Sequence, residues 1–352
     1  MTLKKNYYKL LSLFIAALFL AGCSLGLSRT SSTDGGVYVS VDKGDNWEQK
    51  VFVSKGEKSD VTIGNLNIDR LVLWPTDKQV LYALSGQSGV WATFNSGAEW
   101  KKIFQQSPRS LILHPTNRDI LLVASGNKIF RTVDGGASWQ TVYIEGAPET
   151  AVNDILMDVA DSETIYAITS KGSLLKSRDG GVSWQSIFRF TTEVSRLYMG
   201  AGGTMFVGMP SRGLWRSSDR GVTWIDLQIK LDELNLGRKA GTFRQFAFIP
   251  GTADGFLYVN SYGIFKSSDG GANWELINLV TPPSSVGINT LAINPVNTNE
   301  IFYAISRLLY YSSDGGITWI TKAIPSSRVA TAMAVSSNEN LELFLGLTRP
   351  SK

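Results

Sequence analysis

The chain has 352 residues, among them one cysteine and one histidine. This inventory excludes an intramolecular disulfide, a zinc site built on cysteines and a histidine-based metal cluster. The 34 basic residues outnumber the 30 acidic ones, but Lys4, Lys5 and Lys9 lie in an N-terminal stretch that we expect to be removed. Without them the charges nearly balance, so nucleic-acid binding is not predicted.

The N-terminal lysines are followed by an apolar run over residues 10–20, which leads into Ala21, Gly22 and Cys23. This order is typical of a secretory signal peptide, and the run is too short to span a bilayer comfortably. The sequence Leu-Ala-Gly-Cys resembles the bacterial lipobox, whose cysteine is acylated after cleavage. The resemblance implies a signal peptide over residues 1–22 and a protein held outside the cytoplasm by membrane lipid on Cys23. The alternative is an uncleaved membrane helix with an incidental cysteine.

After an expected flexible tether over residues 23–35, the motif Ser/Thr-x-Asp-x-Gly-x-x-Trp occurs seven times. Its tryptophans, 39 to 53 residues apart, are Trp47, Trp100, Trp139, Trp184, Trp224, Trp274 and Trp319. The aspartate position holds Asp42, Asn95, Asp134, Asp179, Asp219, Asp269 and Asp314. Repeats of this length, each with alternating apolar residues, predict the four-stranded blades of a propeller.

Each position of the motif suits a tight hairpin. The carboxylate can accept backbone N–H bonds, the glycine can adopt a positive φ, and the Ser or Thr hydroxyl can join the same local network. The tryptophan supplies a broad apolar surface for packing. One carboxylate per hairpin falls short of the six or more oxygens that Ca²⁺ requires. We therefore predict structural boxes, and neither a metal nor another cofactor.

The two ends of the repeat region are incomplete in complementary ways. Only one strand, Gly36–Ser40, precedes the first box, whereas two strands, over residues 330–336 and 341–347, follow the last complete blade. We expect the C-terminal strands to complete the N-terminal blade, which would close the ring and protect its edges. The predicted fold is all-β, a single seven-bladed propeller of four-stranded blades over residues 36–348. The nearest candidate for a helix is residues 231–236.

The boxes resemble the Asp-box (BNR) repeats of sialidases, sortilin-type receptors, xyloglucanases and photosystem II stability/assembly factors. The resemblance covers nearly the whole mature chain, and it implies the fold more strongly than the function because these families use one scaffold differently. Photosystem II assembly factor-like proteins are single, often lipid-anchored propellers, which implies a non-catalytic scaffold, expected to be monomeric, that binds another extracytoplasmic protein. The inner strands that end in proline, as in LAINP, instead resemble sortilin- and xyloglucanase-type repeats.

A surface glycan-binding protein or glycoside hydrolase is the alternative function. The Phe/Tyr-Arg-Ile-Pro segment of sialidases has no match in this sequence. Xyloglucanase-like enzymes use a cleft between two propellers, whereas a single propeller is predicted here. An unrecognised acid–base pair would have to come from Asp69, Asp154, Asp232 and Glu233. A sugar platform would draw on Trp74, Trp91 and Trp215, which could equally pack between blades. His114, at a strand end before a proline, is expected to be structural.

Arginines recur where the chain enters the innermost strand of a blade. They are Arg70, Arg109, Arg196 and Arg244, and Asp154 and Asn289 take this place in two other blades. Projecting from the face opposite the boxes, they would form a mainly basic ring suited to a carboxylate, a sulfate or an acidic protein segment. Alternatively, each arginine caps its strand or pairs locally with an acid such as Asp69. The long segment over residues 225–244 either projects over this face or seals the rim.

Overall fold

The computed structural model describes residues 33–74, 76–236, 241–337 and 341–350. The expected signal peptide and Cys23 lie outside these residues. Within the described residues, no helix is both long and apolar enough to cross a membrane.

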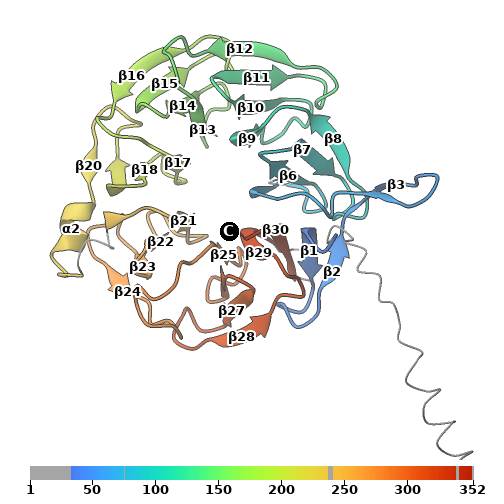
Figure 1. Cartoon of the computed structure of the whole chain (residues 1–352). Coiled ribbons are helices and arrows are strands. Elements are labelled where there is room, and N and C mark those ends of the chain that lie inside the picture. Colours follow the sequence, from blue (N-terminus) through green and yellow to red (C-terminus); the bar gives the residue numbers. More distant parts are fainter. Residues whose placement is uncertain (1–32, 75, 237–240, 338–340, 351–352) are drawn as a thin grey trace, which may run out of the picture. The chain divides into compact units, whose positions relative to one another are not determined.

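Seven four-stranded antiparallel sheets form a closed ring in the described part of the chain (Figure 1). The strands of each blade are given from the innermost outward. Blade 1 consists of β29 (Val329–Ser337), β30 (Leu341–Thr348), β1 (Gly36–Ser40) and β2 (Glu48–Lys50), and blade 2 consists of β5 (Arg70–Leu73), β6 (Leu81–Ser85), β7 (Gly89–Thr93) and β8 (Lys101–Phe104). Blade 3 consists of β9 (Ser110–Leu113), β10 (Leu121–Ser125), β11 (Lys128–Thr132) and β12 (Gln140–Ile144), and blade 4 consists of β13 (Val152–Met157), β14 (Ile165–Thr169), β15 (Ser173–Ser177) and β16 (Gln185–Arg189). Blade 5 consists of β17 (Arg196–Met199), β18 (Met205–Met209), β19 (Gly213–Ser217) and β20 (Ile225–Asp226). Blade 6 consists of β21 (Gln245–Phe248), β22 (Phe256–Val259), β23 (Ile264–Ser267) and β24 (Glu275–Leu276). Blade 7 consists of β25 (Thr290–Ile293), β26 (Ile301–Ile305), β27 (Leu308–Ser312) and β28 (Ile320–Ala323). The predicted fold class is confirmed.

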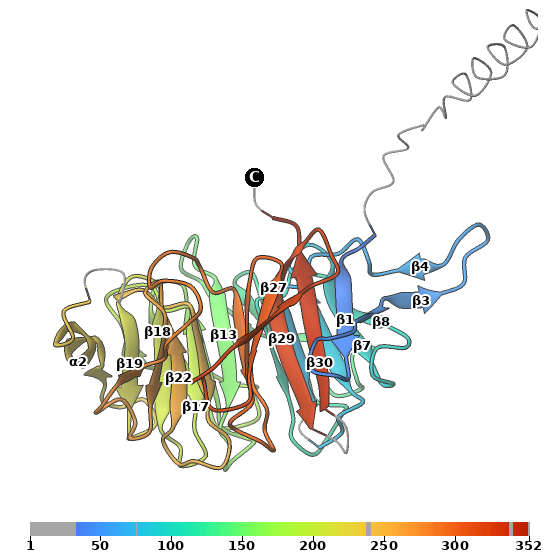
Figure 2. The same cartoon turned by 90° about the horizontal axis from the view of Figure 1, so that it is seen from below.

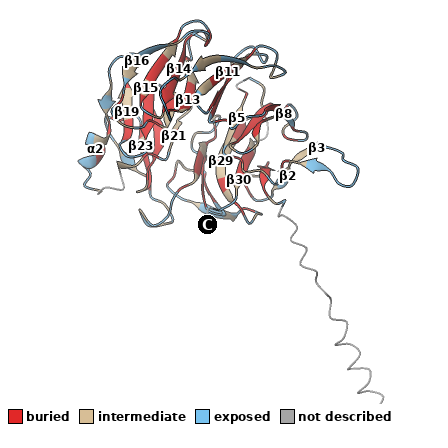
Figure 3. Cartoon of the chain, turned by 45° about the horizontal axis from the view of Figure 1, so that its top comes forward, coloured by how far each residue is buried: buried red, intermediate tan, exposed pale blue. Residues whose placement is uncertain are grey.

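The core lies between neighbouring blades. The second strands, such as β6 (LYALS) and β14 (IYAIT), are buried along their whole length because a blade packs on each side of them (Figure 3). The outermost strands, such as β12 and β16, contain only exposed and half-buried residues, because they form the solvent-facing edge of each blade. Box tryptophans join the blades: the indole N–H of Trp100 donates to the Lys50 carbonyl at 3.0 Å, and that of Trp139 to the Ile103 carbonyl at 2.8 Å.

The boxes form the hairpin between the third and fourth strand of every blade, and Asp42 shows how. Its Oδ1 accepts the Asn46 backbone N–H at 2.8 Å and the Ser40 hydroxyl at 2.7 Å. The Ser40 hydroxyl in turn accepts the N–H of Gly44, whose φ of 94° is one that side-chain-bearing residues rarely adopt. The hydrogen bonds that the Asp42 carboxylate accepts, above all the one from the Asn46 N–H, lower the pKa of Asp42 to about 2. Asn95 keeps the same bond to the backbone, at 2.9 Å to the Glu99 N–H, without a charge.

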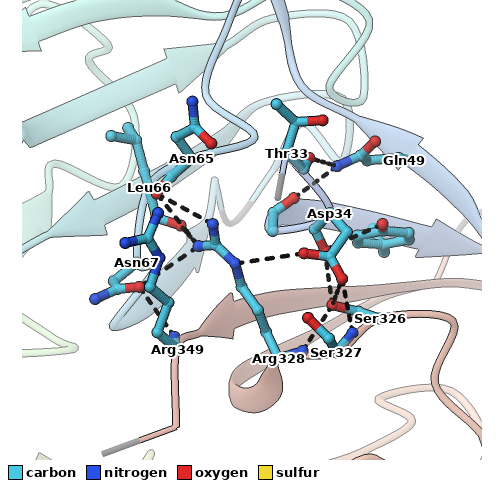
Figure 4. Close-up of polar contacts among 12 residues, drawn as sticks. Thr33, Asp34, Gln49, Asn65, Leu66, Asn67, Ser326, Ser327, Arg328 and Arg349 are labelled. Carbon is cyan, nitrogen blue, oxygen red and sulfur yellow. Dashed lines mark hydrogen bonds and ion pairs between the residues drawn. The ribbon is translucent and has the colours of Figure 1, made fainter. Parts of the chain in front are cut away.

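The ring closes as expected, because β30 pairs with β1 and places two C-terminal strands inside two N-terminal ones. A polar cluster, the closure clasp, sits at this junction (Figure 4). It consists of Asp34, Ser326, Ser327 and Arg328, with the backbone carbonyls of Asn65 and Leu66. Arg328 is 1% exposed and donates to the Leu66 carbonyl at 2.8 Å and the Asn65 carbonyl at 3.3 Å. The Asp34 carboxylate accepts the Ser327 N–H at 2.7 Å and pairs with Arg328 Nε at 3.8 Å.

Two features depart from the regular repeat. A small hairpin of β3 (Phe52–Ser54) and β4 (Val61–Thr62) stands out from the ring between blades 1 and 2 (Figures 1 and 2). The short helix α2 (Gln228–Asp232) lies at the outer edge of the ring and begins three residues before the stretch predicted at 231–236. Its Leu231 is fully buried, so this described part of residues 225–244 seals the rim and does not cover the centre.

Candidate functional site

The arginines predicted from the repeats gather on one face, which we call the mouth. Arg70 and Arg196, the first residues of β5 and β17, pair with Leu84 and Gly208 near the ends of the second strands. The boxed hairpins follow the opposite ends of the third strands. The mouth and the boxes therefore occupy opposite faces of the disc, as Figure 2 shows edge-on.

The arginines do not all occupy equivalent positions. Arg70, Asp154 and Arg196 occupy equivalent positions, because each pairs with the penultimate residue of the second strand of its blade. Arg109 and Arg244 stand one residue earlier, immediately before β9 and β21. Because successive side chains of a strand point to opposite faces, the two groups leave their blades in different directions. The predicted single ring is therefore two interleaved sets.

An ion pair crosses the mouth. The Arg70 Nη1 of β5 lies 3.0 Å from Oδ1 of Asp154 on β13, two blades away, and also donates to the Arg109 carbonyl at 3.2 Å. Asp154 is 2% exposed, and its second oxygen accepts the Leu197 N–H at 3.0 Å. Burial opposes the charge of Arg70, but the adjacent carboxylate outweighs it and the pKa of Arg70 is raised. The partner of Arg70 is thus Asp154 and not the neighbouring Asp69.

Arg109 is fixed by a different chain of contacts. Its Nη1 donates to the Asn153 side-chain oxygen at 3.2 Å, and the Asn153 amide donates to the Val194 carbonyl at 2.8 Å. These bonds link blades 3, 4 and 5 at the mouth. They hold Arg109 in place without neutralising it.

Arg196 and Arg244 make fewer contacts. Arg196 donates to the Ser195 carbonyl at 3.2 Å, and Arg244 Nε donates to the Ser261 hydroxyl at 3.0 Å. Burial, and then the charge of Arg70, lower the pKa of Arg196. Among the described residues, no carboxylate lies within ion-pair distance of Arg109, Arg196 or Arg244. Of the four mouth arginines, these three therefore remain available to a ligand in the part of the chain that the structure describes.

Two adjoining pockets bring the residues together. One, of about 240 Å³, is lined by Arg70, Arg109 and Arg196 together with Asp69 and Glu193. The other, of about 400 Å³, shares Arg70 and Arg196 and adds Arg244, Tyr198 and Asn289. Burial raises the pKa of Tyr198 to about 12, so this phenol is a hydrogen-bond donor at neutral pH. With three carboxylates, Asp69, Asp154 and Glu193, beside four arginines, the mouth is mixed in charge and less basic than the arginines alone suggest.

The carboxylates considered for glycoside hydrolysis fall into two separate places. Asp69 and Asp154 are at the mouth, where Asp154 is held by Arg70 and Asp69 Oδ2 accepts the Gly86 N–H at 2.6 Å. Asp232 and Glu233 are at α2, where they contact Gln228 and Lys230 respectively. In the described part of the chain, no three His, Cys, Asp or Glu side chains are grouped to hold a metal ion.

The tryptophans considered as sugar platforms pack inside the protein. Trp74 is 2% exposed, and the indole N–H groups of Trp91 and Trp215 are buried within blade-to-blade clusters. His114 accepts the backbone N–H groups of Thr116 and Asn117, at 3.3 and 3.1 Å, and so shapes a turn. These four side chains have structural roles.

Comparisons with known proteins confirm the resemblance to BNR-type repeats. Residues 88–201, about a third of the chain, match the Sortilin-Vps10 family (sortilin, neurotensin receptor 3). A xyloglucanase from a Paenibacillus species is 28% identical over 141 residues, which cover 31% of this chain and 13% of that protein. The chain therefore spans a small part of this curated relative.

Two examples illustrate the solved structures that have a similar fold. The GH74 xyloglucanase of Xanthomonas campestris matches with a TM-score of 0.63 and 16% identity, over 85% of this chain and 52% of that one. YCF48, in a complex with a D1 peptide, matches with a TM-score of 0.60 and 17% identity, over 80% of this chain and 94% of that one. At these identities the matches show a shared propeller architecture.

Proposed function

We propose that this chain is a membrane-anchored, extracytoplasmic propeller that binds another protein, or an acidic ligand, at its mouth. The observation that carries the proposal is the pair Arg109 and Arg196. Both guanidinium groups line one pocket, and neither has a carboxylate partner among the described residues.

The chemistry of these side chains favours a carboxylate. A guanidinium group offers parallel N–H donors that match the two oxygens of a carboxylate, and such charge-assisted bonds are stronger than neutral ones. The pair Arg70–Asp154 braces the pocket between them, which spares a ligand the cost of ordering loose side chains. Binding, rather than bond cleavage, is what this arrangement supports best.

The remaining parts of the proposal rest on the sequence and on fold similarity. The lipobox-like segment supports an acyl anchor on Cys23 and a location outside the cytoplasm. YCF48 is a protein of similar extent that has been seen with a bound peptide, which supports peptide capture by a single propeller. The expected role is that of a non-catalytic scaffold.

Affinity capture from solubilised membranes tests the function. Lipidated wild-type protein is compared with Arg109→Glu/Arg196→Glu, and Arg189→Glu is the matched control because Arg189 is exposed at the end of β16, on the outer rim of the same face. We expect a specific protein to be retained by wild type and by Arg189→Glu but lost from the double variant, with equal thermal stability in all three. Equal capture by the double variant would contradict binding at the mouth.

Glycan binding or glycoside hydrolysis is a second candidate, favoured by the stretch of 28% identity with a xyloglucanase. Incubation with xyloglucan, followed by a reducing-end assay and a glycan array, tests it. Turnover that is lost in Asp69→Asn would establish this activity in place of the scaffold role. No turnover and no glycan retention would remove it.

A further inference from the structure

The first described residues lie on the mouth face. Gly36, at the start of β1, pairs with Leu347 near the end of β30, whereas Ser40 at the other end of β1 leads into the first boxed hairpin. Figure 2 shows β1 and β30 side by side across the thickness of the disc. Residues 33–35 therefore reach the propeller on the face that carries Arg70, Arg109 and Arg196.

The closure clasp and its neighbours fix these residues in place. The Gln49 amide donates to the carbonyls of Thr33 and Gly35, at 2.6 and 2.9 Å, and the Gly35 N–H donates to the Gly64 carbonyl at 3.0 Å. Asp34 is bound through both its backbone carbonyl and its carboxylate, as Figure 4 shows. The chain is thus held firmly up to residue 33, and its departure point cannot migrate around the disc without breaking several hydrogen bonds.

We propose that the mouth faces the membrane, so that its partner is a protein segment presented from the bilayer side. This inference rests on the proposed lipid anchor at Cys23. The ten residues from Cys23 to Thr33 can span at most about 33–36 Å, whatever conformation they adopt. The eight residues of β30 alone rise roughly 25 Å between the two faces. If the boxed face were turned to the bilayer, crossing the thickness of the disc would use most of the length that the residues from Cys23 to Thr33 can span.

The fit of partner and surface follows from this orientation. The unpaired cations Arg109 and Arg196 would meet a carboxylate on a loop or terminus that emerges from the same membrane. A soluble partner would have to enter between the mouth and the bilayer. The boxed face would remain open to solvent.

Two labels at opposite ends of one strand test the orientation. Arg307 precedes β27 on the mouth face, and Ser313 follows it on the boxed face; both are exposed. In the lipidated chain that begins at Cys23, acylation consumes the thiol of this only native cysteine, so Arg307→Cys and Ser313→Cys each carry one reactive thiol. Each variant is labelled with a fluorophore and reconstituted into phosphatidylcholine liposomes that contain a spin-labelled lipid quencher.

We expect at least about twofold stronger quenching at position 307, since the six residue steps along β27 from 307 to 313 separate the labels by roughly 20 Å. Equal quenching, or stronger quenching at position 313, would overturn the orientation and leave the anchor standing. Failure of the chain to associate with the liposomes would overturn the anchor and the orientation together. Gln87→Cys, in the exposed mouth-side turn between β6 and β7, replaces Arg307→Cys if that variant unfolds at a lower temperature than wild type.

Discussion

Arg70 on β5 and Asp154 on β13 form an ion pair of 3.0 Å that passes over the intervening blade. Asp154 is 3% exposed in its side chain, whereas Arg70 is 29% exposed, so the carboxylate carries the larger desolvation cost. Its two oxygens offset that cost by accepting from the guanidinium and from the Leu197 N–H. The pair ties three blades together at the rim of the pocket.

Removing Asp154 should therefore destabilise the propeller. We expect Asp154→Ala to lower the free energy of unfolding by about 2–4 kcal/mol, because it leaves Arg70 without its counter-charge. Urea denaturation measures this loss. Asp69→Ala is the control: Asp69 is exposed and makes one backbone contact, and a loss as large as that of Asp154→Ala would contradict the special role of the cross-mouth pair.

The box aspartates make the free energy of unfolding depend on pH in the acidic range. The pKa of Asp42 is about 2 in the folded protein, and hydrogen bonds in the equivalent hairpins lower the pKa values of the other five box aspartates as well. A depressed pKa contributes stability that is present above the ordinary value of about 4 and is lost as the pH falls through the folded value. Denaturation between pH 5 and 2 should show this progressive loss.

The acid dependence has an internal control. Asp42→Asn should retain the hairpin, as Asn95 does naturally, and should flatten the pH dependence slightly. Asp60→Asn, at an exposed position immediately before β4, should leave the curve unchanged. A curve for Asp42→Asn as steep as that of wild type would show that this box does not contribute.

Arg328 should be indispensable for ring closure. Arg328→Ala removes the donor to the carbonyls of Asn65 and Leu66 and the ion-pair partner of the Asp34 carboxylate, which we expect to cost about 3 kcal/mol or more. Amide hydrogen exchange should accelerate first in β1 and β30. Arg328→Lys should rescue little, because an ammonium group cannot reproduce the planar fork of donors. Uniform acceleration across all blades would indicate general destabilisation and not opening at the closure.

Substitutions of Trp100 measure how much one contact between neighbouring blades contributes to stability. Trp100 is 1% exposed, and its indole donates to the Lys50 carbonyl of the preceding blade at 3.0 Å. Trp100→Phe keeps much of the apolar packing and should cost about 1–2 kcal/mol for the lost hydrogen bond. Trp100→Ala should cost about 3–5 kcal/mol, because it also leaves a cavity. Similar losses for both variants would assign the whole effect to the hydrogen bond.

The features that the sequence predicted are those determined locally. A box aspartate bonds to backbone groups within four residues, so Asp42 and its equivalents could be assigned a role from their motif. The closure of the ring also followed from counting strands at the two ends. The sequence indicates the β3–β4 hairpin only indirectly, because the hairpin lengthens the spacing from Trp47 to Trp100, which is the longest between consecutive box tryptophans.

The features that sequence reasoning missed depend on contacts between distant segments. Asp154 was recognised as interrupting the arginine series, but no repeat pattern shows that it meets Arg70 across two blades. The one-residue offset of Arg109 and Arg244 requires the strand register, which apolar alternation does not fix. Arg328 immediately precedes β29, just as Arg109 precedes β9. Extending the comparison to blade 1, the composite blade built from strands of both chain ends, could have found it.

The composite blade also sets the order in which the protein can mature. In its own sheet, β1 pairs with β2 and with β30, which ends at Thr348. In a chain that emerges N-terminus first, the inner edge of β1 therefore has no partner until residues 341–348 of β30 have also emerged. During that interval the six other blades can assemble as an open arc, with the edge of β1 exposed to proteases and to neighbouring chains. Completion of the ring thus requires nearly the whole chain, and a chain that stops before Leu341 never reaches it.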